Sequence, residues 1–242
     1  LDEEVKAFIA KTASCYPERG EPPTISQIRE DYEAMCVQFS APYPEGLKVA
    51  DAVIEVPSLP PISLRWYQPQ GASKLPALIY FHGGGFVMGG LESHDSICAD
   101  LAFDAGLEVM AVDYRLAPEH LFPAALNDVA AAVEYFCAHQ PDRPFLLAGD
   151  SAGAWLAARL SHQLAASEKP LLGQLLIYPT LGGDVDSGSY LMHADAPMLT
   201  RQDVLWYSRQ FWGTENPELQ DGPLVQKDFT SLPPTLIFAA SC

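Results

Sequence analysis

Five short, almost uninterrupted apolar runs constrain the fold of this chain more than any other feature of its sequence. They cover residues 77–81, 108–112, 145–148, 175–178 and 235–239. Runs of this length are typical of strands that are buried on both faces of a parallel sheet. Helical patterns lie between the first four runs, at residues 96–105, 124–139 and 152–166. The sequence therefore predicts a doubly wound, mostly parallel α/β sheet.

The N-terminal part of the chain has a different pattern. Residues 3–15 and 26–39 are amphipathic and predict two helices, the second of which is preceded by a capping box that starts at Thr24. Residues 53–56 and 62–67 alternate apolar with polar side chains and predict a β-hairpin. We therefore divide this part into N-terminal cap helices (1–45) and an α/β core (46–180).

Residues 181–232 are too many for a simple crossover between strands. A second capping box starts at Thr200, and Trp206, Tyr207, Phe211 and Trp212 follow it. An aromatic stripe on a helix needs an apolar partner, and we expect the N-terminal helices to supply it. We interpret residues 181–232 as a cap insertion and residues 233–242 as one more core strand.

The composition excludes several classes of partner. Asp and Glu number 31 against 14 Lys and Arg, which gives a net charge of -17. This charge repels nucleic acid and anionic lipid surfaces. Neither a secretory signal nor a membrane-spanning run is visible, so we expect no membrane insertion and a cytoplasmic location, with the periplasm left open. The five cysteines have no metal-site spacing, which predicts buried free thiols and no bound metal.

The junction between the run at 145–148 and the helix at 152–166 consists of Gly149, Asp150 and Ser151. Ala152 and Gly153 then open the helix. In a nucleophile elbow, a serine occupies a strained turn between strand and helix, and flanking glycines avoid collisions with the neighbouring backbone. The junction predicts Ser151 as a catalytic nucleophile, with a serine that merely caps the helix as the alternative. We expect the Asp150 carboxylate to accept backbone N–H groups and brace the turn.

A glycine tract follows the run at 77–81 directly: His82, Gly83, Gly84 and Gly85. Backbone N–H groups in such a tract are unobstructed and can converge on the oxyanion of a tetrahedral intermediate. A phosphate cradle is the alternative use. The sequence has neither the GK[ST] ending nor the GxGxxG spacing of such cradles, and its acidity favours an uncharged ligand.

These two motifs and the block from Asp113 to His120 resemble those of the hormone-sensitive-lipase-like esterases, the bacterial family IV (GDXG) enzymes of the α/β-hydrolase superfamily. The resemblance implies hydrolysis of carboxylic esters without a cofactor. It also implies that the cap helices form the acyl pocket. The implied site consists of Ser151 as nucleophile, Gly84, Gly85 and Ala152 as oxyanion hole, and His82, Gly83, Gly149, Asp150 and Gly153 as support.

The acid and the base of a triad are harder to place. In this hydrolase order both follow the serine, but the histidines after Ser151 are His162, about three turns further along the same helix, and His193 in the cap insertion. His82 precedes the serine, and we expect it to shape the glycine loop. We expect the Asp and the His to follow residue 242 in a longer parent chain, so the α/β core would lack its C-terminal strand and helix. This form would be nearly inactive.

Other motif residues are expected to be structural. Arg115, Glu119 and His120 predict an ion-paired network that holds their loop. His94 and His139 have no partner pattern in the sequence and are expected at the surface or internally satisfied. Family members commonly carry Gly and Asn where this chain has Ala154 and Trp155, so the packing beneath the elbow is expected to differ.

Three functions remain open on the sequence alone. The leading hypothesis is an esterase that acts on short or medium acyl esters, because the cap is apolar but small. The second is a non-catalytic small-molecule binder, since plant gibberellin receptors resemble the same family and lack the catalytic His. The third is an amidase or another acyl-transfer enzyme. A homodimer through an edge strand is also compatible with the sequence.

Overall fold

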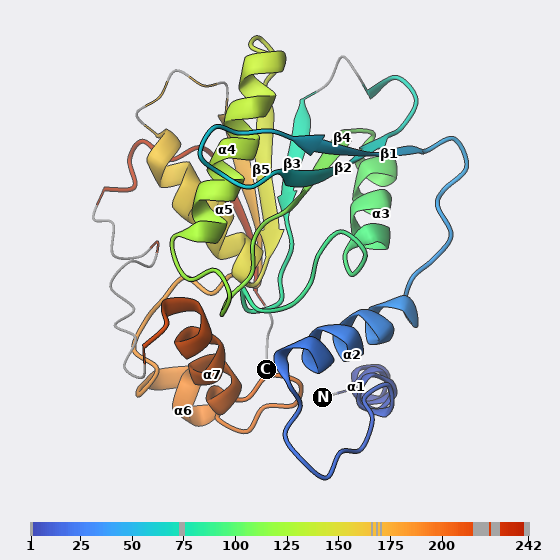
Figure 1. Cartoon of the computed structure of the whole chain (residues 1–242), viewed down its shortest axis with the longest axis vertical. Helices are drawn as coiled ribbons and strands as arrows, with labels where there is room; N and C mark the ends of the chain where they lie inside the picture. The colour runs from blue at the N-terminus through green and yellow to red at the C-terminus, as the bar shows by residue number, and fades with distance from the viewer. Residues whose placement is uncertain are drawn as a thin grey trace.

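The computed structural model describes residues 2–239 except 73–75, 166, 168, 170, 215–222 and 224–227. Within this part of the chain, a sheet of seven strands has the order β1-β2-β4-β3-β5-β6-β7 (Figure 1). The predicted α/β fold class is confirmed.

One edge of the sheet is antiparallel. β1 (Lys48–Ile54) pairs with β2 (Ile62–Gln68), and β2 pairs with β4 (Glu108–Asp113) in the same sense. The predicted hairpin is therefore confirmed, but its first strand begins five positions earlier than residue 53. β1 is an edge strand with mostly exposed side chains, so its pattern is set by pairing with β2 and not by burial.

The centre of the sheet is parallel and aligns the two motif loops. β3 (Ala77–Phe81) pairs with β4 on one side and with β5 (Phe145–Asp150) on the other, and Phe81 lies opposite Gly149. Parallel strands in this register end at the same edge of the sheet. The loops that follow Phe81 and Asp150 therefore leave the sheet side by side.

The far side of the sheet continues in the same direction. β6 (Leu171–Ile177) pairs with β5, and β7 (Thr235–Phe238) pairs with β6. β6 begins four positions before residue 175, in a stretch where Leu172 is exposed and where Gly173 and the buried polar Gln174 interrupt the apolar pattern. The predicted strand at 235–239 is confirmed, whereas residues 240–242 lie outside the described part.

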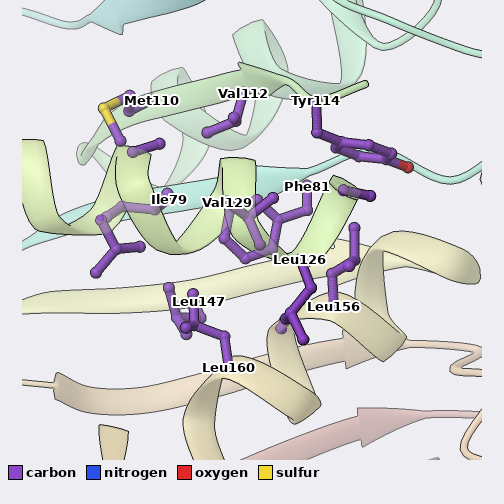
Figure 2. Close-up of a cluster of buried hydrophobic side chains, with 14 of the residues drawn as sticks. Ile79, Phe81, Met110, Val112, Tyr114, Leu126, Val129, Leu147, Leu156 and Leu160 are labelled. Carbon is purple, nitrogen blue, oxygen red and sulfur yellow. The ribbon is translucent and has the colours of Figure 1, made fainter. Parts of the chain in front are cut away.

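Three helices cover the two faces of the sheet. α3 (Asp95–Ala105) packs Cys98, Ala99 and Ala102 against Leu78 and Tyr80. α4 (Ala124–His139) and α5 (Ala152–Leu164) cover the opposite face, where they bury the larger hydrophobic cluster. Figure 2 shows part of this cluster: Ile79, Phe81, Met110, Val112, Tyr114, Leu126, Val129, Leu147, Leu156 and Leu160.

Four further helices gather at one end of the molecule, near the carboxyl ends of the parallel strands (Figure 1). They are α1 (Glu3–Ser14), α2 (Ile25–Val37), α6 (Gly188–Met192) and α7 (Arg201–Trp212). Both predicted capping boxes are present, one before α2 and one before α7. Among the described residues, no helix combines the length and the apolar character that crossing a membrane requires.

The aromatic residues of α7 pack on the core. The ring of Phe211 stacks on Phe86 at 3.8 Å between centroids and meets Phe122 and Trp155 edge to face. The prediction that the N-terminal helices would receive this stripe was therefore wrong for Phe211. Its partners are core side chains that the sequence places far from one another, so no local pattern could reveal them.

The cysteines only partly match the prediction of buried thiols. Cys98 is fully buried, whereas Cys15, Cys36 and Cys137 are half-buried, and all four are free. Cys242 lies outside the described residues.

Candidate active site

Ser151 occupies a strained turn between β5 and α5. Its backbone dihedrals are φ 50° and ψ -115°, a region that costs a non-glycine residue about 1–3 kcal/mol. The Ser151 N–H donates to the carbonyl of Ile177 in β6 at 2.9 Å, which holds the turn. Its side chain makes no capping hydrogen bond to the helix, contrary to the alternative of a simple helix cap. The Ser151 hydroxyl therefore lies at the N-terminus of α5 without capping that helix.

Two glycines allow α5 to approach β3 closely. A Cβ atom at Gly153 would lie 1.9 Å from the carbonyl oxygen of Phe81 and 2.5 Å from that of His82. A Cβ atom at Gly149 would lie 2.5 Å from the same Phe81 oxygen. These neighbours are backbone atoms that cannot move aside, so only glycine fits at either position.

The glycine tract forms a tight turn beside the elbow. Gly84 and Gly85 have φ values of 110° and 62°. The N–H groups of Val87 and Met88 both donate to the carbonyl of Gly84 at 3.0 Å, which closes the turn. A Cβ atom at Gly84 would lie 2.1 Å from the Met88 carbonyl oxygen, and one at Gly85 would lie 2.4 Å from the Tyr207 ring. The turn thus requires glycine at both positions.

Asp150 ties the elbow to the glycine tract. Its buried Oδ1 accepts hydrogen bonds from the Gly83 N–H at 2.9 Å and from the Tyr80 hydroxyl at 2.8 Å. Burial acts to raise the pKa of this carboxyl, but hydrogen bonds from His94 and Tyr80 outweigh burial and lower it. The carboxylate is therefore held ionised between the two motif loops.

His82 is a buried and neutral part of the loop. Its ring stacks on Tyr114 at 4.2 Å, and Nδ1 lies 2.7 Å from the carbonyl oxygen of Gly83. Burial, helped by the nearby His94, lowers the pKa of His82 to about 3. A group with this pKa stays unprotonated at neutral pH and shapes the loop through packing.

His94 belongs to the same assembly, although the sequence did not single it out. It is buried at the start of α3, with Nε2 3.3 Å from Asp150 Oδ1 and 3.3 Å from the Gly83 nitrogen. Its Nδ1 lies 2.9 Å from the Ser93 hydroxyl, which also accepts from the Gly90 N–H. Because Asp150 is 56 positions away in the chain, only the folded structure reveals the pair.

A mainly apolar cavity of about 380 Å³ opens at this point. Ser151, Ala152, Gly84 and Gly85 all line it. Its hydrophobic walls come from the glycine loop, from α5 and from the segment containing α6 and α7: Phe86, Trp155, Val185, Leu199, Val204, Phe211 and Trp212. The predicted nucleophile and the residues of the predicted oxyanion hole thus border one space suited to a small apolar ligand.

Four tyrosines also line the cavity, namely Tyr32, Tyr178, Tyr190 and Tyr207, and the first two were not singled out in the sequence. Tyr32 projects from α2, and Tyr178 follows β6 with a φ of 36°. Burial and the negative charge of Asp150 raise the pKa of Tyr178 to about 12, so its hydroxyl stays protonated. Neither was predicted from the sequence, because tyrosines carry no motif of their own.

Histidines are absent from the described lining of this cavity. His162 lies on α5 and meets Phe229 edge to face, and His193 is exposed at the end of α6. His139 is exposed, with its Nδ1 2.8 Å from the carbonyl oxygen of Tyr135, and His120 is also exposed. The described residues also contain no cluster of three or more His, Cys, Asp or Glu side chains able to hold a metal ion.

The other sequence expectations concern support residues. Arg115 pairs with Asp128 at 2.7 Å and Glu119 pairs with Arg29 at 2.6 Å, which confirms the predicted ion pairs of that loop. Trp155 is buried beneath the elbow and meets Phe86 edge to face at 5.6 Å. It therefore forms part of the cavity wall as well as the core.

Comparisons with known proteins agree with this geometry. A family model described as the alpha/beta hydrolase fold matches residues 78–242. The chain is 37% identical over 210 residues to the esterase LipI of Mycobacterium tuberculosis, covering 82% of this chain and 65% of LipI. It is 38% identical over 176 residues to an ethyl acetate hydrolase of Pseudomonas putida, covering 69% of this chain and 55% of the relative.

A solved structure shows the same fold. The hyperthermophilic esterase from the archaeon Pyrobaculum calidifontis superposes with a TM-score of 0.83 at 31% identity, covering 98% of this chain and 79% of that one. The chain thus spans about two thirds or less of the curated relatives described above.

Proposed function

The chain belongs to the alpha/beta-hydrolase-fold family, and from that premise we propose that it carries the nucleophile and the oxyanion hole of a carboxylic-ester hydrolase. The observation that carries the proposal is one shared cavity: Ser151, Ala152, Gly84 and Gly85 line it together. A serine in a strained elbow beside unobstructed backbone amides is the arrangement that acyl transfer requires. The curated names of the relatives, esterase and ethyl acetate hydrolase, support the same chemistry.

The proposed reaction proceeds through an acyl-enzyme. Ser151 Oγ attacks the acyl carbon, and the carbonyl oxygen takes the negative charge of the tetrahedral intermediate. The N–H groups of Gly84, Gly85 and Ala152 bind that oxygen. Collapse of the intermediate releases the alcohol, and water then attacks the acyl-enzyme to release the acid and restore the serine.

The serine proton needs a general base. His82 is unsuited to this role, because it is buried and its pKa is lowered to about 3. An Asp and a His that follow residue 242 stay our prediction for the acid and the base, in the chain order usual for this hydrolase type. The near-inactivity of a chain without them is part of the same prediction.

We propose short or medium acyl esters as substrates. A cavity of about 380 Å³ lies at the small end of the range for ligand sites, about 300–1,000 Å³, and its described walls are mostly apolar. The aromatic contact between Phe86 and Phe211 closes part of the space that a long acyl chain would need. Rates on esters of increasing acyl length would test this, with a steady rise toward long chains as the contrary result.

A non-catalytic small-molecule binder is the second candidate. The observation that favours it is that no histidine lines the described cavity. Such a protein would bind an ester in the same cavity and return it unchanged. An amidase would use the same serine, and paired ester and amide substrates would separate it from the esterase.

Labelling of the full-length protein, which carries the predicted general base, with a fluorophosphonate probe tests the proposal directly. The probe modifies activated serines, and we expect intact-mass analysis to show one adduct that peptide mapping places on Ser151. Ser151→Ala should stay unmodified, whereas Ser167→Ala, a change outside the cavity, should label like the wild type. Absence of the adduct on the wild type, or equal labelling of Ser151→Ala, would contradict the proposal.

Location and assembly also stay predictions. We propose a cytoplasmic protein that takes a small-molecule ester, with a homodimer as one form of assembly. Fractionation of cells and light scattering of the purified protein would test the two statements separately.

A further inference from the structure

We infer that His94 is a positioning residue of the oxyanion loop and acts on it through the Asp150 carboxylate. The inference rests on the proposed function, since it concerns the amides of Gly84 and Gly85. It assigns a role to a histidine that lies outside both sequence motifs and outside the described cavity lining.

His94 contacts the loop near its first glycine. Its Nε2 lies 3.3 Å from Asp150 Oδ1, and the same Oδ1 accepts the N–H of Gly83 at 2.9 Å. A Cβ atom at Gly83 would lie 2.1 Å from Asp150 Oδ2, so the carboxylate occupies the space that a side chain at this position would need. A small rotation of the carboxylate would therefore move Gly83 and, with it, the adjacent Gly84.

His94 also holds the far end of the same loop. Its Nδ1 lies 2.9 Å from the Ser93 hydroxyl, which accepts from the Gly90 N–H at 2.9 Å and donates to the Gly90 carbonyl at 3.1 Å. One imidazole thus connects the two ends of the segment from 83 to 90. The proposed oxyanion amides lie inside that segment.

The Asp150 carboxylate needs this partner. It is buried, and an ionised carboxylate without sufficient donors is unstable in such a place. Tyr80 and the Gly83 N–H each give one hydrogen bond to Oδ1, while Oδ2 has His94 Nε2 at 3.4 Å. Without His94, Oδ2 would lose its contact with Nε2 and the carboxylate would rotate toward another donor.

A role limited to helix capping does not fit the geometry. His94 precedes α3, but its side chain makes no capping hydrogen bond to that helix. Both ring nitrogens face the loop assembly instead. The imidazole is therefore directed at the site and not at the helix it precedes.

Paired variants of His94 test the inference on the full-length protein, which carries the predicted general base. His94→Gln keeps an N–H donor where Nε2 lies, whereas His94→Phe keeps the ring volume without either nitrogen. His139→Phe is the matched control, because His139 is an exposed histidine remote from the cavity lining. The rate of fluorophosphonate labelling, measured against probe concentration, separates the maximal rate constant from the affinity for the probe.

We expect His94→Phe to lower the maximal labelling rate by roughly 10- to 100-fold with unchanged affinity, less than the ~10²–10³ of a lost oxyanion donor. His94→Gln should stay within about threefold of the wild type, and His139→Phe should equal it. Hydrogen exchange of the 82–90 segment should accelerate in His94→Phe alone.

Three results would overturn the inference: wild-type labelling by His94→Phe, equal losses in the Gln and Phe variants, or a loss confined to affinity. Each presupposes that the wild type labels on Ser151. A wild type that fails to label would instead contradict the proposed function, and the exchange of the 82–90 segment would still test the contact of His94 with the loop.

Discussion

At the scale of single residues, the site depends on glycines at positions where no side chain would fit. The Ser151 hydroxyl is positioned by the backbone turn that leads into α5. Gly149 and Gly153 allow the backbone on both sides of this turn to approach the end of β3 closely. The energy of the strained φ at Ser151 is offset by packing around it. Substitutions at these glycines should therefore act on the fold and on the site together.

Gly153→Ala should lower the free energy of unfolding by about 1–3 kcal/mol, because the new methyl would overlap the Phe81 carbonyl. Gly20→Ala is the matched control, since nothing lies within 4 Å of a Cβ at that exposed position. Urea denaturation of both variants checks the prediction. A Gly153→Ala protein as stable as the control would show that α5 does not approach β3 as described.

His82 should make stability depend on pH. Its pKa is about 3 in the folded chain against about 6.5 when unfolded, so the unfolded state binds the extra proton between these values. Stability from this group is complete above about pH 6.5 and is lost as pH falls toward 3, by up to about 1.4 kcal/mol per unit. Urea midpoints at pH 6 and pH 4.5 should differ less in His82→Phe or His82→Gln than in the wild type. A pH dependence unchanged from that of His139→Phe would refute the assignment.

The motif residues were predictable for a physical reason. Where a nearby backbone atom excludes any side chain, as at Gly84 and Gly153, the required glycine is visible in the sequence even when that backbone atom is not known. The role of His94 is not visible in this way, because it depends on contacts with Asp150 and Ser93 that form only when the chain folds. Side chains that act through distant partners are found only after the chain has folded.

At the scale of elements, one arginine joins the N-terminal helices to the site. Arg29 on α2 donates to the carbonyls of Val87 and Ala117 at 2.7 and 3.0 Å and pairs with Glu119. Val87 ends the turn that contains the glycine tract, and α2 also carries Tyr32 in the cavity wall. Arg29 therefore links the α2 side of the cavity to the loop that contains the glycine tract.

Arg29→Met should loosen α2, because it keeps the aliphatic stem but removes hydrogen bonds from a charged donor, each worth about 1.5–3 kcal/mol. We expect limited proteolysis to cut residues 1–45 several-fold faster, with the core of the chain intact. Arg19→Met is the control, since Arg19 forms its salt bridge with Asp31, which lies inside the same region. Equal protection of residues 1–45 in the wild type and Arg29→Met would contradict the link.

The element pattern shows where periodicity succeeds and where it fails. Runs buried on both faces, such as 77–81, match their strands to the residue. β1 was misplaced because an exposed edge strand carries little apolar pattern. The partners of Phe211 were missed because they come from the loops that contain Phe86 and Phe122.

At the scale of the whole molecule, the net negative charge should lower the reaction rate of anionic esters relative to neutral ones. The net charge of -17 repels anionic ligands over a distance set by the ionic strength. An ester with a negatively charged acyl group should react with Ser151 more slowly than a neutral ester of equal length at 10 mM salt. The difference should shrink at 300 mM salt, while the neutral ester changes little. If the ratio of the two rates did not change with salt, repulsion of anionic esters by the net charge would be ruled out.

The comparisons define how far the resemblance extends. The hormone-sensitive-lipase-like character expected from the motifs is confirmed by relatives named esterases and by the fold they share. Esterase activity of the whole protein stays a proposal, because the chain spans 65% of LipI.

The most direct test of the central claim is a crystal structure of the full-length protein after reaction with a phosphonate ester. We expect phosphorus bonded to Ser151 Oγ, and one phosphoryl oxygen within about 3 Å of the amide nitrogens of Gly84, Gly85 and Ala152. An adduct on another residue, or a phosphoryl oxygen turned away from those amides, would contradict the account.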